Sequence, residues 1–336
     1  MIKTNARTLI TFPTTRVTMN NHDSLYLQTC AGLLEYGRPS SDRTGTGTTK
    51  APGLNMRFFM KDGLPLLTSK FTAMRLIERE LFAFLNGFTD NKWFESHNVH
   101  IWDAFTNAEG ELGPVYGAIW RGTNKNQQVD QLADLMKNLR EKPMSRRHIV
   151  TGWVPELLPV EGRSHAENVD AGLQALPPCH TMWQVHCHEL TLDERQELMA
   201  ETHRTYIVVD TEVKQHIVFD SHKIPRYGVS LQLFQRSADM FLGVPFNIAS
   251  YSLLLHYIAH SLNMVPHSFI WNGGDCHIYN NHVEQMNLQI SREKDAPPSP
   301  QIRFKCAPKD IWDYTADDFE IVGYEHMGKI GGLMAV

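Results

Sequence analysis

The chain is 336 residues long, 42% of them hydrophobic and 21% charged, and its formal net charge is −5. These proportions are typical of a soluble globular protein, and no apolar run approaches the roughly 20 residues that a membrane-spanning helix needs. The acidic balance argues against a general nucleic-acid-binding protein, which would carry a basic surface. Five cysteines in so long a chain do not suggest a disulfide framework, so we expect a reducing, cytoplasmic location.

The first part of the chain combines an extension, a helix and a polar loop. Residues 1–22 lack the apolar core of a secretory signal and are predicted to be a poorly ordered N-terminal extension. Apolar residues then recur at helical spacing over 22–36. The loop 42–48 is rich in glycine and threonine, but its glycines fit neither the dinucleotide-binding nor the P-loop spacing. We interpret it as a flexible loop that carries Arg43.

The middle and later parts of the chain mix helices and strands. Helical patterns cover 71–85, which ends at Asn86-Gly87, and 130–141, which is stopped by Pro143. Strands are predicted over 148–154, 181–186 and 229–234. Residues 247–262 are apolar nearly all round, as in a buried central helix. This irregular alternation predicts an α/β or α+β fold with a mixed sheet in one domain, residues 23–336.

Two segments of the chain have the character of insertions. Residues 156–173 are polar and loop-like, and residues 188–225 are charged and rich in histidine. Within the second segment, strands are plausible over 205–209 and 216–219. We expect both segments to lie at the periphery of the domain.

The sequence Leu176-Pro177-Pro178-Cys179-His180 is the most informative local feature. Two prolines fix the backbone and withhold their N–H groups, so Cys179 follows a stiff, non-helical stretch. Stiffness suits a nucleophile, which must be held within about 3–3.5 Å of its target atom. The alternative is a small buried thiol, because free cysteine is among the most buried residue types.

Other polar groups admit both functional and structural interpretations. Arg236 and Ser237 follow a predicted strand and suit phosphate oxygens, or else form a solvated strand end. Asn247 could read the imide edge of uracil or cap the helix that it opens. His277 and Tyr279 alternate on an extended segment and so face one side. The run His186-Cys187-His188 has poor zinc-ligand spacing, since neighbouring strand residues point to opposite faces.

In this order along the chain, these motifs resemble those of the thymidylate synthase family, over residues 42–336. The segments that carry the resemblance are Asp42-Arg43-Thr44-Gly45-Thr46-Gly47-Thr48, Gly113-Pro114-Val115-Tyr116-Gly117, Ser145-Arg146-Arg147, Leu176-Pro177-Pro178-Cys179-His180, Gln235-Arg236-Ser237-Ala238-Asp239, Pro245-Phe246-Asn247-Ile248-Ala249-Ser250-Tyr251 and Gly273-Gly274-Asp275-Cys276-His277-Ile278-Tyr279.

The resemblance implies a fold and a reaction. The fold would be a single α/β domain with a large mixed β-sheet flanked by helices, and two such sheets would stack face to face in a homodimer. The reaction would be the reductive methylation of dUMP to dTMP, with 5,10-methylenetetrahydrofolate as the donor of both carbon and hydride. Cys179 would add to carbon 6 of the uracil ring and so make carbon 5 nucleophilic. Arg236 would favour its thiolate. No metal is implied.

The resemblance also implies a role for each matching residue. Nucleotide contacts would be made by Arg43, Arg236 and Ser237 at the phosphate, by Arg146 and Arg147 reaching from the neighbouring subunit, by Asn247 at the uracil, and by His277 and Tyr279 at the deoxyribose hydroxyl. Proton transfers would involve Glu80, Tyr116 and His180. Folate contacts would come from Lys70, Trp102 and Asp239, and the carboxylate of Val336 would close the site near Arg43.

Some features depart from the family pattern or leave other functions open. Phe71 stands where many relatives carry a basic residue, and Phe105 replaces a more usual tryptophan. The nearest alternative activity is a dUMP hydroxymethylase on the same fold, which would release tetrahydrofolate. Asn247 favours uracil over cytosine in either case. An RNA-binding protein that kept the fold, and a zinc hydrolase that uses the Cys/His run, are more distant alternatives.

Overall fold

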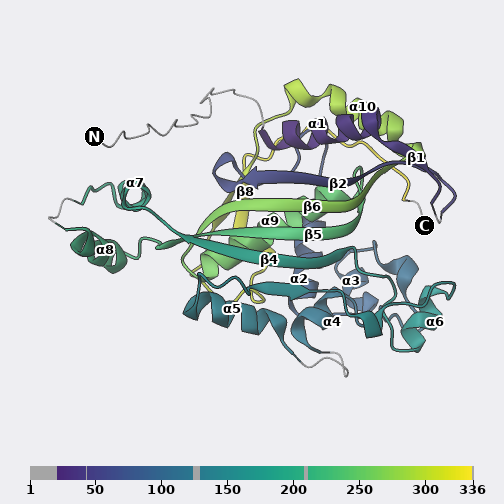
Figure 1. Ribbon diagram of the computed structural model, residues 1–336, viewed down its shortest axis with the longest axis horizontal. Helices are drawn as coiled ribbons and strands as arrows, with labels where there is room; N and C mark the ends of the chain where they lie inside the picture. Colours follow the sequence, from purple (N-terminus) through teal and green to yellow (C-terminus); the bar gives the residue numbers. More distant parts are fainter. Residues whose placement is uncertain (1–20, 43, 124–128, 208–210, 335–336) are drawn as a thin grey trace, which may run out of the picture.

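A computed structural model describes residues 21–42, 44–123, 129–207 and 211–334. Its centre is a six-stranded sheet in the order β1-β2-β6-β5-β4-β3 (Figure 1). Its strands are β1 (Arg38–Ser40), β2 (Thr48–Phe59), β3 (Ile149–Thr151), β4 (His180–Glu189), β5 (Tyr227–Asp239) and β6 (Val265–Tyr279). The β5–β6 pair is parallel and the other pairs are antiparallel, so the sheet is mixed, as expected. A small second sheet pairs β7 (Gln301–Phe304) with β8 (Phe319–Val322).

Helices flank the large sheet, which confirms the expected α/β class. They are α1 (Asn21–Tyr36), α2 (Met74–Leu85), α3 (Asn91–Ser96), α4 (Tyr116–Arg121), α5 (Gln131–Glu141), α6 (His165–Asp170), α7 (Leu192–His203), α8 (Glu212–Ser221), α9 (Gly243–Ser261) and α10 (Val283–Ser291). Because α1 begins at Asn21, the predicted extension overlaps the first helix by two residues. Residues 1–20 lie outside the described part of the chain.

The core lies between the sheet and α9, which packs on β5 and β6 behind the strands in Figure 1. Alternation along β5 turns Val229, Leu231 and Leu233 toward α9, and all three are fully buried. Helix α9 is buried along most of its length, as its all-round apolar sequence predicts. It begins at Gly243, four residues before Asn247. Asn247 therefore lies within the helix and does not cap it.

The other face of the sheet carries a mixture of polar and apolar side chains. Cross-strand neighbours on this face include Met182 with Phe234 and Gln184 with Gln232, all half-buried. Ile149, which pairs with Gln184, has an exposed fraction of 43%. In Figure 1 the strands β4, β5 and β6 lie in front of α9 and present this face to the viewer.

The segment 188–225 contains a helical pair, α7 and α8, and the predicted strand over 216–219 is wrong because those residues lie in α8. Val and Ile in this stretch resemble a strand sequence, but the side chain of Thr211 accepts a hydrogen bond from the Lys214 N–H and starts a helix. Residues 205–207 form no strand, and 208–209 lie outside the described residues. Figure 1 shows the pair projecting from the ends of β4 and β5. Met199, Phe219 and Ile224 form a small core between the two helices.

The segment 156–173 is also more regular than its polar sequence suggests. It contains part of a 3₁₀ turn (Pro155–Leu157) and the short helix α6. A capping box starts α6, since Ser164 and Glu167 exchange side-chain and backbone hydrogen bonds.

Candidate active site

Cys179 lies in the irregular stretch immediately before β4, as the two prolines predicted. Its carbonyl accepts a hydrogen bond from the Arg236 N–H (2.7 Å), which lies near the end of β5. Its own N–H donates to the Tyr116 hydroxyl (2.9 Å) at the start of α4. Both backbone groups of Cys179 are therefore fixed by separate elements, and the half-buried thiol is held in one place.

Two opposing effects act on the charge of this thiol. Burial raises the pKa of Cys179, whereas the Arg236 guanidinium, whose Nη2 lies 3.8 Å from Sγ, lowers it. Arg236 favours the thiolate as expected, but burial is the larger effect and the net shift in pKa is upward. The guanidinium also donates to the carbonyls of Pro177 (3.2 Å) and Pro178 (3.3 Å), which orients it beside the sulfur.

A chain of hydrogen bonds connects the residues behind the thiol. The His180 side chain hydrogen-bonds Asn247, and Asn247 Oδ1 also accepts from Gln235 Nε2 at 2.9 Å. Gln235 is itself fixed, because its Oε1 accepts from the indole of Trp271 (2.8 Å). Burial lowers the pKa of His180 to about 4, so this imidazole is neutral at pH 7. Its ring centroid lies 5.1 Å from that of Tyr116.

Glu80, on α2, is the acidic group of this region. Burial raises its pKa to about 7, although the Trp102 indole donates to Oε1 (3.0 Å) and partly offsets this shift. The Trp102 ring meets Tyr116 edge to face, with centroids 6.2 Å apart. Glu80, Trp102 and Tyr116 thus connect α2 to Cys179. A carboxyl with a pKa near neutrality is suited to giving and taking protons.

A pocket of about 230 Å³ lies beside this network. Its lining residues are Ser41, Asp42, Thr48, Lys50, Ser237, Asp275, His277 and Tyr279. His277 and Tyr279 lie on the same side of β6, as alternation predicted, with ring centroids 5.1 Å apart. Arg43, whose expected role is at the phosphate, lies outside the described residues, although its neighbour Asp42 lines the pocket.

Two of the expected folate contacts, Asp239 at the end of β5 and Lys70 in the loop before α2, hydrogen-bond the turn that follows β5. Asp239 Oδ1 accepts from the backbone N–H groups of Phe241 (2.9 Å) and Leu242 (3.2 Å). Lys70 is 5% exposed and donates to the Phe241 carbonyl, and its Nζ lies 3.8 Å from the Phe241 ring centroid. Burial lowers the pKa of Lys70 to about 8. In this position Lys70 supports the turn, and a contact with the folate tail would require it to leave the Phe241 carbonyl.

The two arginines assigned to a neighbouring subunit lie apart from this network. Arg146 and Arg147 are both exposed, just before β3. The carbonyl of Arg146 accepts a hydrogen bond (3.1 Å) from Gln184. Gln184 lies on the face of the sheet opposite α9, which we call the open sheet face. Among the described residues neither guanidinium has a hydrogen-bond or ion-pair partner. Val336 lies outside the described residues.

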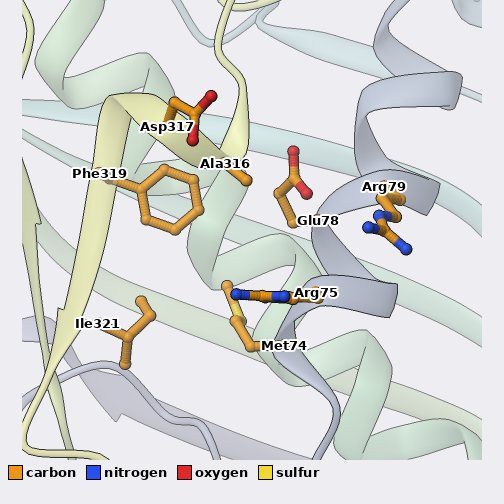
Figure 2. Close-up of a pocket in the computed structure, with 8 residues that line it drawn as sticks. All are labelled: Met74, Arg75, Glu78, Arg79, Ala316, Asp317, Phe319 and Ile321. Atoms are coloured by element: carbon orange, nitrogen blue, oxygen red, sulfur yellow. The ribbon is translucent and has the colours of Figure 1, made fainter. Parts of the chain in front are cut away.

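A larger cavity, about 590 Å³, lies between α2 and β8 (Figure 2). Met74, Phe319 and Ile321 form its apolar part, and charged side chains on its rim include Arg75 and Asp317. None of the residues expected to bind substrate or folate lines it. Its size therefore does not mark it as the reaction site.

Two further observations bear on other classes of protein. Within the described ranges, no group of three or more His, Cys, Asp and Glu side chains could hold a metal ion. No helix in the same part of the chain is long and apolar enough to cross a membrane.

Sequence reasoning missed the supporting residues of the site. Gln235 was quoted within a motif but given no role, and Lys50 and Asp275 were not singled out. Their importance arises from strand pairing: β2 places Lys50 opposite His277, and β5 places Ser237 opposite Asp275. Alternation along each strand was readable from the sequence, but the register between distant strands was not.

Together these features define a class of protein. A single α/β domain holds a fixed thiol beside a guanidinium, a buried amide network and a carboxyl with a raised pKa, as in an enzyme with a cysteine nucleophile. A model of the family described as thymidylate synthase matches residues 24–336 of the sequence.

Similar proteins support the same family. Proteins named thymidylate synthase from Francisella philomiragia subsp. philomiragia and Francisella tularensis subsp. holarctica are each 40% identical to this chain over 311 residues. The matches cover 93% of this chain and 99% of each relative. The chain therefore belongs to the thymidylate synthase family, as its motifs indicated.

Proposed function

We propose that this chain catalyses the reductive methylation of dUMP to dTMP, with 5,10-methylenetetrahydrofolate as co-substrate. The observation that carries the proposal is the position of Cys179, whose sulfur lies 3.8 Å from Arg236 Nη2 at the edge of a buried amide network. The family supplies the reaction, and the geometry supplies a fixed nucleophile with a cation beside it.

Cys179 begins the reaction by covalent addition. The thiol loses its proton to water, and a lone pair of the sulfur then forms a bond to carbon 6 of the uracil. The electrons of the carbon 5–carbon 6 double bond move toward carbon 5 and the carbonyl at carbon 4, which gives an enolate. Arg236 assists because its positive charge stabilises the thiolate.

Asn247 selects uracil through the orientation of its amide. Its Oδ1 already accepts a hydrogen bond from Gln235, so Nδ2 is directed to the ligand as a donor. A donor matches the carbonyl at carbon 4 of uracil and opposes the amino group at the same position of cytosine. The buried network therefore favours dUMP over dCMP.

Glu80, Tyr116 and His180 carry out the proton transfers. The pKa of Glu80, raised to about 7, allows the carboxyl to exchange protons near neutral pH. His180 stays neutral and fixes Asn247, while the Tyr116 hydroxyl lies against the backbone of Cys179. Burial raises the pKa of Tyr116, so its hydroxyl stays protonated, and we assign Tyr116 and His180 to the network through which the proton at carbon 5 leaves, not to the base itself.

The residues near this site fit a folate. Trp102, 8% exposed, offers an aromatic wall, and Asp239 Oδ2 accepts no hydrogen bond from the residues that the structure describes, so it can orient a pterin. When bound, methylenetetrahydrofolate supplies the carbon and the hydride. Val336 would close the site over this pair and keep water out. Lys70 reaches the folate tail only if it leaves Phe241.

The enzyme acts as a homodimer, in which the open faces of two sheets stack. Support comes from the apolar side chains on that face, such as Ile149, and from Arg146, whose carbonyl is bound to the same face by Gln184. Stacking about a two-fold axis would carry Arg146 and Arg147 toward the partner's nucleotide phosphate. We place the enzyme in the cytoplasm, where its five free cysteines would stay reduced.

Product analysis tests the activity directly. Purified protein is incubated with dUMP and methylenetetrahydrofolate, and the nucleotide and the folate are identified together. We expect dTMP and dihydrofolate in equal amounts. Formation of hydroxymethyl-dUMP and tetrahydrofolate would instead establish the hydroxymethylase activity. If neither nucleotide product forms, the proposal is contradicted.

A further inference from the structure

Three side chains are connected in a row along the pocket of about 230 Å³ that Ser237 and Tyr279 also line. Lys50 Nζ lies 3.2 Å from Asp275 Oδ2, and Asp275 Oδ1 lies 3.1 Å from His277 Nδ1. One carboxylate thus holds a cation with one oxygen and an imidazole with the other. Lys50 is directly opposite His277 in the antiparallel pairing of β2 and β6, and all three residues line the pocket.

Asp275 determines what His277 can offer to a ligand. Two acceptors lie near Nδ1, namely Asp275 Oδ1 and, at 3.3 Å, the Asp275 carbonyl oxygen. Nδ1 is therefore the nitrogen that carries the proton. In a neutral imidazole the other nitrogen, Nε2, then has a lone pair and accepts hydrogen bonds. An acceptor at this position recognises a hydroxyl group.

The ion pair between Lys50 and Asp275 contributes little to the stability of the fold. The two side chains are 42% and 46% exposed, and exposed ion pairs stabilise proteins only slightly. Its effect is local, because the ammonium fixes the carboxylate in the orientation that meets His277. Without Lys50, Asp275 could rotate toward solvent and release Nδ1.

We propose that Lys50 and Asp275 are positioning residues that hold His277 as its Nδ1–H tautomer, so that Nε2 accepts a hydrogen bond from the 3′-hydroxyl of the nucleotide. This inference rests on the proposed function, in which His277 contacts the deoxyribose. It assigns recognition of the nucleotide's 3′-hydroxyl to three residues on two strands, and it identifies Lys50 as a determinant of nucleotide affinity.

The test compares Lys50→Met, Asp275→Asn and the double variant with the wild type. Lys137→Met, on the exposed face of α5, is the matched control for loss of one positive charge. For each protein we measure kcat, KM for dUMP, and the binding of 2′,3′-dideoxyuridine 5′-monophosphate, which lacks the hydroxyl. Nitrogen-15 NMR of the His277 ring reports the tautomer without any need for activity.

We expect KM for dUMP to rise about tenfold in Lys50→Met and Asp275→Asn, with kcat within about twofold and dideoxy binding unchanged. The double variant should be no worse than Asp275→Asn alone. In both single variants the Nδ1–H tautomer should be less populated, because the backbone carbonyl of Asp275, at 3.3 Å, is then the only fixed acceptor that the described residues place beside Nδ1. Lys137→Met should match the wild type in every measurement.

Several results would overturn the inference. One is an unchanged KM in Lys50→Met, and another is an equal loss of affinity for the dideoxy nucleotide. A further loss from Lys50→Met in the Asp275→Asn background would show that Lys50 acts on the phosphate directly. A wild-type protein that makes no dTMP would overturn the proposed function itself. An active wild type with any of the earlier results would reject only the positioning role of Lys50 and Asp275.

Discussion

At the scale of single residues, the site places a thiol whose burial disfavours the anion beside an arginine that partly offsets this effect. Burial raises the pKa of Cys179, and Arg236 lowers it. A thiol with a raised pKa is mostly protonated at pH 7 and therefore reacts slowly with other molecules, and Arg236 limits how far the pKa rises. The balance between these two effects sets how reactive the free enzyme is.

Substitution of Arg236 should make the thiol of Cys179 more basic. In Arg236→Met the cation is removed while burial remains, so the pKa of Cys179 rises further and less thiolate is present at each pH. The pH dependence of Cys179 alkylation by iodoacetamide, followed by mass spectrometry, should shift to higher pH. A profile that stays in place or moves to lower pH would show that Arg236 does not act on the sulfur.

Ionisation of the Glu80 carboxyl should destabilise the folded protein as the pH rises. Its pKa of about 7 lies above the ordinary value of 4.5, so the folded protein holds a proton there that the unfolded chain releases. The stability of the wild type relative to Glu80→Gln should therefore fall between about pH 4.5 and 7, by about 3 kcal/mol in all, and then level off.

Denaturant unfolding at pH 5 and pH 8 measures this difference for both proteins. The same variant should lose about 100-fold or more in kcat, because glutamine cannot exchange protons. Equal pH dependence in the two proteins would mean that Glu80 is ionised as readily as a solvent-exposed glutamate.

At the scale of elements, the sequence predicted regular structure well where burial repeats with a clear period. The alternation in 229–234 and the all-round apolar run of α9 both lie in the core. Residues 216–219 of α8 resemble a strand because β-branched residues favour strands locally, whereas the Thr211 cap and the packing of Phe219 stabilise a helix. Within the site, the stiff stretch before Cys179 could be predicted from its two prolines, but the Lys50–Asp275 pair could not, since 225 residues separate its members.

The arm formed by α7 and α8 should be dispensable for the reaction. It has its own small core, and its buried Arg195 is bound by Asp220 and by the Ile224 carbonyl, so its packing is largely internal. Glu189 and Tyr227 are paired across β4 and β5, so a tight turn of about two to four residues can join the strands there.

We expect a variant with residues 190–226 replaced by such a turn to fold and to retain kcat within about threefold, because no expected site residue lies in the arm. Thermal unfolding and steady-state kinetics measure both properties. Loss of activity in a shortened protein that remains folded and dimeric would show that the arm contributes to the site.

At the scale of the whole molecule, the proposed active site requires two chains. The exposed positions of Arg146 and Arg147 on the side of the open sheet face suit a contribution to the partner's phosphate site. In that arrangement a chain can lack its own nucleophile and still complete its neighbour's site.

Mixing two inactive variants tests this arrangement. Cys179→Ala and Arg147→Glu proteins should each be inactive alone, but after joint unfolding and refolding the mixture should recover about a quarter of the wild-type activity. Half of the dimers would be mixed, and each mixed dimer would hold one complete site. No recovery, with mixed dimers demonstrated by tagged subunits, would contradict an active site shared between chains.

The most direct test of the central claim is to locate the nucleotide on the protein during turnover. The reaction of wild-type enzyme with dUMP and methylenetetrahydrofolate is stopped by rapid denaturation, and the digested protein is mapped by mass spectrometry. Cys187→Ala, which removes a half-buried thiol in β4, serves as the control and should behave as the wild type. We predict that the mass of the nucleotide is found on the peptide that contains Cys179 and is absent from Cys179→Ala. Formation of dTMP with the nucleotide on another cysteine, or with full activity in Cys179→Ala, would contradict it.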